Sequence, residues 1–245
     1  TVFITHVHGD HVFGFPFLLL ERKYISDREG QQPLTVVGTP FVKERLTHLC
    51  RLAFPGSLDS MLEHITWVMD DEGQLDDGWR WERFEVHHED AVEPHGYRFE
   101  HESGASFVHS GDSGPCEPLY DAIERSHLAI LEMGFPDWVP STHHHKPKDI
   151  LAFSERCKTP LGITHTYIDD ESPKVAVPAL IIVCATASLA GVIHTHCVVG
   201  RIPANVQQLV HTLVDAERRG TRANADQEKD DPVHEVEALC VGRIG

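Results

Sequence analysis

The sequence has few basic residues for its size. It contains 21 lysines and arginines against 38 aspartates and glutamates, which gives a formal net charge of −17. Proteins that bind nucleic acid gain much of their affinity when lysine and arginine displace counterions from the phosphates. Local basic patches at Arg22 and Lys23, or at Lys146 and Lys148, remain possible. The deficit nevertheless disfavours a nucleic acid and favours a small molecule as the substrate.

The cysteines lack any Cys-x-x-Cys spacing. Six cysteines are spread over 245 residues, far below the density of a small disulfide-stabilised scaffold. We therefore expect reduced thiols and a cytoplasmic protein. The remaining composition, with 41% hydrophobic and 24% charged residues, is typical of a globular chain long enough to bury a core in one domain.

No segment is a convincing membrane span. Residues 175–193 carry no charge and approach the roughly 20 residues that a transmembrane helix needs. Pro178, many alanines and threonines, and few leucines or phenylalanines favour instead a buried strand or helix pair. We expect no membrane association, a closing segment of uncertain structure over residues 171–219, and a polar, flexible tail over residues 220–245.

Residues 5–11, Thr-His-Val-His-Gly-Asp-His, are the most informative segment. Three imidazoles and one carboxylate fall within residues 6–11, directly after the strand-like run Thr1-Val-Phe-Ile4. Imidazole nitrogens and carboxylate oxygens are ligands that zinc accepts at about 2.0–2.2 Å. Because alternate residues of a strand point to the same side, His6 and His8 can hold one ion. Asp10 and His11, where the chain turns, can face a second ion.

This His-x-His-x-Asp-His motif resembles the signature of the metallo-β-lactamase-fold hydrolases. Three further motifs follow in the order typical of that family: residues 84–88 with the Gly-Tyr-Arg of residues 96–98, the Ser-Gly-Asp-Ser of residues 110–113, and the Gly-Ile-Thr-His of residues 162–165. The resemblance implies an α/β fold, a metallo-β-lactamase-type αββα sandwich, over residues 1–170. Since the family places strands before its first motif, we expect this domain to be N-terminally incomplete and to lack its N-terminal strands.

The resemblance also implies a set of metal ligands. One ion is expected at His6, His8 and His88, a second at Asp10, His11 and His165, and Asp112 is expected to bridge them. His87 is the alternative to His88. Related di-iron flavoproteins carry glutamate in place of His8, and many true β-lactamases carry cysteine or serine in place of Asp112. We therefore expect two divalent ions, zinc or manganese, and no hydrolysis of β-lactam antibiotics.

Two segments are similar to the phosphodiesterase branch of the family, which includes tRNA 3′-processing endonucleases and class II cyclic-nucleotide phosphodiesterases. These segments are residues 131–136, Leu-Glu-Met-Gly-Phe-Pro, and residues 142–147, Thr-His-His-His-Lys-Pro. In that branch a glutamate at a strand end and a histidine that opens a helix lie just outside the metals. The resemblance implies Glu132 and His145 as this catalytic pair, with His144 as the alternative and Asp10 orienting the nucleophile. The alternative interpretation is that the three histidines of residues 143–145 form a solvated surface triplet with no catalytic role.

These observations predict a dinuclear metal-dependent hydrolase. We expect it to cleave a cyclic nucleotide or another small phosphodiester by attack of a metal-bridging hydroxide, because paired ions stabilise both the entering and the leaving oxygen. A tRNA 3′ end is a less favoured substrate, since no glycine-rich basic arm is visible between His11 and His88. Alternatives are a thioester, lactone or sulfate ester hydrolase, or a non-catalytic truncated metal-binding relic. A homodimer is possible, as in many relatives.

Hydrophobic periodicity and turn residues also predict individual elements. Helices are expected over residues 13–24, 41–54 and 117–125, and strands over residues 34–37, 65–68, 79–86, 97–102, 105–109 and 127–132. Residues 70–78 are expected to form an acidic loop.

Overall fold

The computed structural model describes residues 1–166 and 180–182, and it contains two β-sheets. The smaller sheet is parallel, with the order β1 (Val2–Phe3), β2 (Leu34–Val37) and β3 (Ile65–Val68). The larger sheet has the order β10-β9-β8-β7-β6-β5-β4. Its strands, in chain order, are β4 (Glu72–Gln74), β5 (Trp79–Glu85), β6 (His95–His101), β7 (Ser106–His109), β8 (Leu128–Glu132), β9 (Leu161–Thr164) and β10 (Leu180–Ile182).

The larger sheet changes character at β7. Strands β7, β8, β9 and β10 run parallel, whereas β4, β5, β6 and β7 are joined as antiparallel neighbours. Parallel strands need crossover connections, and these are supplied by α5 (Glu117–Glu124) between β7 and β8 and by α6 (Pro147–Arg156) between β8 and β9. The carboxyl ends of the parallel strands therefore point to one edge of the sheet.

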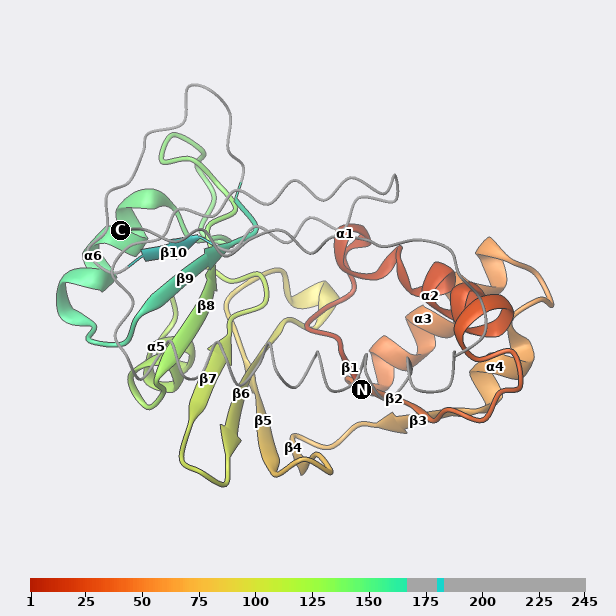
Figure 1. Ribbon diagram of the computed structural model, residues 1–245. Helices are drawn as coiled ribbons and strands as arrows, with labels where there is room; N and C mark the ends of the chain where they lie inside the picture. The colour runs from red at the N-terminus through yellow and green to blue at the C-terminus, as the bar shows by residue number, and fades with distance from the viewer. Residues whose placement is uncertain (167–179, 183–245) are drawn as a thin grey trace, which may run out of the picture. The chain divides into compact units, whose positions relative to one another are not determined.

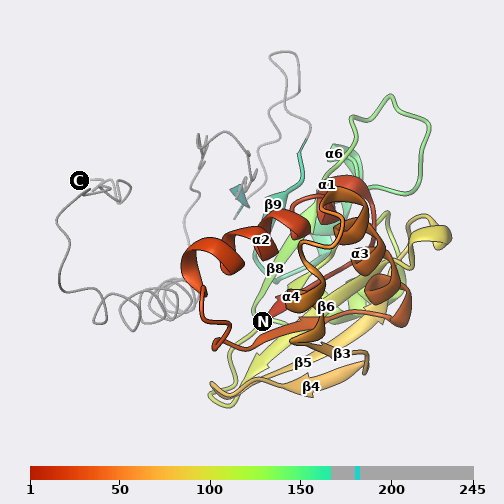
Figure 2. The same ribbon diagram turned by 90° about the vertical axis from the view of Figure 1, so that its right-hand side faces the viewer.

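Helices cover the outer face of each sheet, as Figures 1 and 2 show. The smaller sheet packs against α2 (Phe15–Glu21), α3 (Pro40–Ala53) and α4 (Asp59–Glu63), with Leu19, Leu46 and Leu62 in a common core with Val36. The larger sheet packs against α5 and α6, and this core contains Ile123, Phe153 and Leu131. The short α1 (Gly9–Val12) and the π-helix η1 (Arg22–Ser26) flank α2, and a 3₁₀ turn, η2 (Asp90–Val92), follows β5.

Aromatic side chains fill the space between the two sheets. Phe3 of β1 makes edge-to-face contacts with Trp81, Tyr97 and Phe99 of the larger sheet, with ring centroids 5.5, 5.2 and 4.9 Å apart. On β7 the side chains alternate, since Phe107 stacks on Phe99 while Val108 is fully buried on the helical side. The order of layers is helix, sheet, sheet, helix, which confirms the αββα sandwich.

The segment that follows β1 is bonded to both sheets. The Ile4 N–H donates to Val37 O of β2 at 3.0 Å, and the Ile4 carbonyl accepts from the buried hydroxyl of Tyr97 on β6 at 2.9 Å. The next carbonyl, that of Thr5, accepts from the His95 N–H at 2.9 Å. Residues 4 and 5 are thus held in place directly before the first histidine of the motif.

Most predicted elements agree with the structure, with three differences. The helix predicted over residues 13–24 is divided into α2 and the π-helix η1, and a separate short helix, α1, precedes it at Gly9–Val12. The predicted loop over residues 70–78 contains β4, in which Gly73 pairs with Trp81 of β5 and a Cβ at this glycine would lie 2.7 Å from the Trp81 ring. The short α4 was not predicted.

Several predictions lie outside the described residues. They concern the segments 171–219 and 220–245, of which the structure describes only β10, paired in parallel with β9. In the described part of the chain, no helix has the length and apolar character that crossing a membrane requires.

Candidate metal centre

The predicted ligand residues lie in the segments that follow strand ends. His6, His8, Asp10 and His11 come after β1 and continue into α1, and His88 follows β5. Asp112 lies in the turn after β7, preceded by Gly111, whose φ of +61° and close approach to His95 O leave no room for a side chain. His165 follows β9 with a φ of +52°, a left-handed conformation that residues other than glycine rarely adopt.

Four of these side chains form a first donor set: His6, His8, His88 and Asp112. Their ligand atoms lie within 4.8 Å of one another. His8 Nδ1 is 3.1 Å from His6 Nε2 and 3.1 Å from His88 Nε2. Nitrogens about 2.0–2.1 Å from a tetrahedral ion are separated by about 3.3 Å. The spacing of this set therefore suits a divalent cation.

A second donor set shares Asp112 with the first and adds Asp10, His11 and His165. His11 Nε2 lies 3.3 Å from Asp112 Oδ1, and His165 Nε2 lies 3.4 Å from Asp112 Oδ2. His165 Nε2 also lies 3.1 Å from Asp10 Oδ2. The structure thus brings all seven predicted ligand residues together, and it places the Asp112 carboxylate between the two sets. His88 belongs to the first set, whereas His87 points to Thr142.

Contacts behind the histidines orient their rings. His88 Nδ1 is 2.8 Å from the His143 carbonyl, so this nitrogen donates the hydrogen bond and Nε2 faces the donor set. His6 Nδ1 lies 3.1 Å from Thr5 Oγ1, and His8 Nε2 lies 3.6 Å from Glu89. Metal-binding histidines are typically held this way, since the outer hydrogen bond fixes both tautomer and ring orientation. Thr5 and Glu89 were not identified from the sequence, where no signal distinguishes them from other polar residues.

The charges of the site suit cation binding. Burial lowers the pKa of His6 to about 3 and also lowers the pKa of His88, so these imidazoles are in the neutral form that binds metals. Burial alone would raise the pKa of Asp112, but the His11 imidazole, 3.3 Å away, and the other nearby imidazoles hold it below its usual value. Burial opposes a charge on His11, and the Asp112 carboxylate outweighs this effect and raises the pKa of His11.

Two buried ring nitrogens lack a well-formed hydrogen bond with any described residue: His11 Nε2 and His144 Nδ1. Buried polar atoms in proteins are nearly always paired, and an exception calls for an explanation. A cation between His11 and Asp112 would satisfy the first of these atoms. Together with the convergent donors, this observation shows that the residues present fit a pair of divalent ions.

The structure places His144, the alternative in the predicted pair, beside the donor sets, and places His145 away from them. The residue is fully buried, and its ring is held by the Ser113 carbonyl, 2.5 Å from Nδ1, and by the Tyr120 hydroxyl, 3.2 Å from Nε2. Adjacent residues of an extended segment point in opposite directions. His144 therefore takes the position predicted for His145, with its Nδ1 3.3 Å from Glu132 Oε1 and 3.9 Å from Asp112 Oδ2.

Glu132 lies at the end of β8, behind His144, and is 1% exposed. Its Oε1 accepts hydrogen bonds from the backbone N–H groups of Ser113 at 3.1 Å and His145 at 2.9 Å. Its Oε2 accepts from the Gly134 N–H at 2.5 Å. Burial raises the pKa of Glu132, an effect that the neighbouring His144 opposes. The carboxylate links the Asp112 turn to the His144 loop and lies beside the imidazole.

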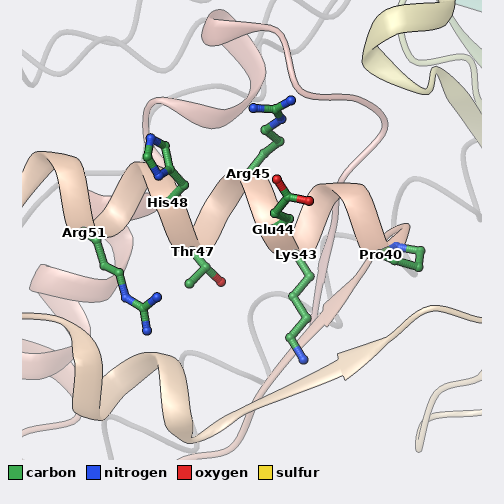
Figure 3. Close-up of a pocket in the computed structure, with 7 residues that line it drawn as sticks. All are labelled: Pro40, Lys43, Glu44, Arg45, Thr47, His48 and Arg51. Carbon is green, nitrogen blue, oxygen red and sulfur yellow. The ribbon is translucent and has the colours of Figure 1, made fainter.

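A separate cavity of about 580 Å³ lies on α3 and is lined by Pro40, Lys43, Glu44, Arg45, Thr47, His48 and Arg51. In Figure 3, Lys43 and Arg51 point to one side of the helix, whereas Arg45 and His48 point to the other. None of these residues belongs to the donor sets. The cavity is therefore not part of the candidate metal centre.

Comparison with known families agrees with this geometry. The family described as "Beta-lactamase superfamily domain" matches residues 1–165. The chain belongs to this family. The match spans the whole segment from the first motif to His165, so the resemblance drawn from the motifs is confirmed.

Relatives of this superfamily protein include ribonuclease Z of Exiguobacterium sibiricum, 33% identical over 141 residues that cover 54% of this chain and 43% of the relative. Ribonuclease Z of Ligilactobacillus salivarius is 25% identical over 138 residues, 54% of this chain and 42% of the relative. The solved structure of a long form RNase Z from yeast has a TM-score of 0.54 at 15% identity, and the match covers 75% of this chain and 31% of that one. The chain thus spans less than half the length of these relatives.

Replacing Asp112 tests its position between the donor sets. We expect Asp112→Asn to retain no more than one divalent ion per chain after dialysis, because the variant loses the anionic oxygens common to both sets. The measurement is metal content by inductively coupled plasma mass spectrometry, with the exposed Asp121→Asn as the matched control. Two ions retained in Asp112→Asn would contradict the shared-ligand assignment.

The buried position of His145 predicts a dependence of stability on pH. Burial lowers the pKa of His145 to about 4 from 6.5, so between these values only the unfolded chain protonates this residue, and stability falls as the pH drops from 6.5 toward 4. At pH 5 the loss amounts to about 2 kcal/mol. In EDTA-treated protein, urea unfolding of His145→Asn should show a drop between pH 7.5 and 5 that is smaller by this amount. An equal loss of unfolding free energy in the wild type and in His145→Asn would contradict the lowered pKa of His145.

Proposed function

We propose that this protein is a metal-dependent phosphodiesterase whose preferred substrate is a cyclic nucleotide or another small phosphodiester. The observation that carries the proposal is the carboxylate of Asp112 between two donor sets, with His144 at their edge backed by Glu132. Two neighbouring cation sites that share a ligand suit a displacement at phosphorus, because charge develops on the entering and the leaving oxygen together.

The donor sets suit zinc, and manganese is the alternative. Two such ions supply Lewis acidity and lower the pKa of a water molecule toward roughly 7. The protein's own groups complete the chemistry. The side chain of Asp10 is 63% exposed, so it lies on the open side of the site and can accept a hydrogen bond from the attacking water.

His144 is the proton donor in this proposal. Glu132 faces its Nδ1 at 3.3 Å, so Nε2 is the ring nitrogen that faces the substrate and gives its proton to the leaving oxygen. Three backbone N–H groups fix the Glu132 carboxylate, which keeps the imidazole in one orientation. His145 supports the loop from behind and has no part in proton transfer.

Charge supports a small substrate over a folded RNA. The net charge of −17 disfavours extensive phosphate contacts. A ribonuclease that acts at RNA 3′ ends is the second candidate, because the curated relatives are named Ribonuclease Z. Cytoplasmic location and homodimer formation remain predictions.

The first experiment is hydrolysis of bis(p-nitrophenyl) phosphate by protein loaded with zinc or with manganese, followed as nitrophenolate release. We expect turnover that EDTA abolishes and that added metal restores. Folded, metal-loaded protein without turnover on this diester, but active on a thioester or lactone, would overturn the phosphodiesterase proposal and leave the fold assignment intact.

Replacing His144 tests the proton donor. His144→Ala should lower kcat by about 10²- to 10⁴-fold with little change in KM, because the group acts mainly in the transition state. The loss should be greater for an alkyl leaving group than for p-nitrophenolate, which needs less protonation. His143→Ala, an exposed neighbour in the same loop, is the matched control. An equal loss for both leaving groups would exclude a proton-donor role.

A further inference from the structure

A row of rings leads from the second donor set to an aromatic side chain outside it. His11 stacks on His165 with ring centroids 5.4 Å apart and planes at 22°, and His165 stacks on His144 at 5.8 Å and 13°. Beyond His144 lies the Phe135 ring, 4.4 Å away and tilted by 59°. The three imidazoles and Phe135 therefore form one continuous wall.

Phe135 differs from the other aromatic residues near the centre. Among the described residues, it is the one Phe, Tyr or Trp whose ring contacts a histidine of the donor sets or His144. Phe13, 63% exposed, lies over Gly9 beside Asp10, and Trp138 is 81% exposed. Phe135 is partly exposed, so it offers a ring surface to a bound molecule while its contact with His144 fixes its position.

Backbone contacts place Phe135 next to His144, the proposed proton donor. The preceding residue, Gly134, donates to Glu132 Oε2, the same carboxylate that faces His144. A Cβ at Gly134 would lie 2.6 Å from His144 Nδ1 and 3.0 Å from Glu132 Oε2. A side chain would not fit there, so the glycine allows the chain to pass close to Glu132 and His144. The next residue, Phe135, then contacts the His144 ring.

We propose that Phe135 is a specificity residue that stacks on a flat group carried by the leaving oxygen, such as a nucleobase or an aryl ring. The proposal rests on the proposed function, in which His144 protonates that oxygen. A group attached to that oxygen would then lie beside Phe135, the aromatic ring that contacts His144. The substrate class is therefore a phosphodiester whose leaving group is a nucleoside or an aryl alcohol. Phe135 does not contact the ester group that stays on the phosphorus.

The kinetic test uses two diesters that share the p-nitrophenyl leaving group. Methyl p-nitrophenyl phosphate retains a methyl group, and bis(p-nitrophenyl) phosphate retains an aryl group. Phe135→Leu, which keeps apolar bulk and removes the flat face, should lower kcat/KM about 5- to 150-fold for both, while Phe135→Tyr should restore it. A loss confined to the bis-aryl substrate, or no loss, would overturn the proposal.

A binding test does not depend on turnover. Calorimetry on metal-loaded protein should show tighter binding of adenosine 5′-monophosphate than of ribose 5-phosphate, and Phe135→Leu should abolish this preference. Trp138→Leu, in the same loop, is the matched control and should change neither result. If the wild type cleaves neither diester but shows the preference, the phosphodiesterase proposal fails and the stacking site stands. Absence of the preference overturns the stacking site, whatever the turnover.

Discussion

The buried carboxylate of Glu132 is the constraint on which the arrangement of the centre depends. A buried acidic group is costly unless hydrogen bonds compensate for lost hydration, and here three backbone N–H groups from three segments do so. One segment carries Asp112, a second carries His144 and the third leads to Phe135. A single side chain at the end of β8 thus fixes the spacing of Asp112, His144 and Phe135, to which the proposals above assign a shared metal ligand, a proton donor and a stacking ring. The same burial that raises its pKa also keeps water away from these bonds.

Much of the donor geometry could be predicted because it depends on short-range rules. His6 and His8 are separated by one residue at the end of a strand, so their side chains converge without any long-range information. The motifs after β5, β7 and β9 then identify the remaining ligands through resemblance. The αββα order was predicted through the same resemblance, and the alternation of strands and helices along the chain agrees with it.

The structure differs from the sequence-based predictions where contacts between distant segments decide the outcome. His144 and His145 are chemically identical in the sequence, and only the packing of His145 against Ser113 and Tyr120 separates them. Periodicity could not divide residues 13–24, because α2 and η1 are both helical and follow each other without a break. Strand β4 is acidic and lacks alternation, and its place in the sheet depends on pairing with β5, which no local pattern records.

The contact between Asp10 and His165 joins residues 155 positions apart in the chain. The members of the second donor set therefore cannot meet until both sheets have formed and packed, because Asp10 follows a strand of one sheet and His165 a strand of the other. A partly folded chain holds only fragments of the donor sets, among them the pair His6 and His8, which bind a cation far less tightly than the complete set. A complete pair of cation sites therefore requires that the two halves of the sandwich have come together.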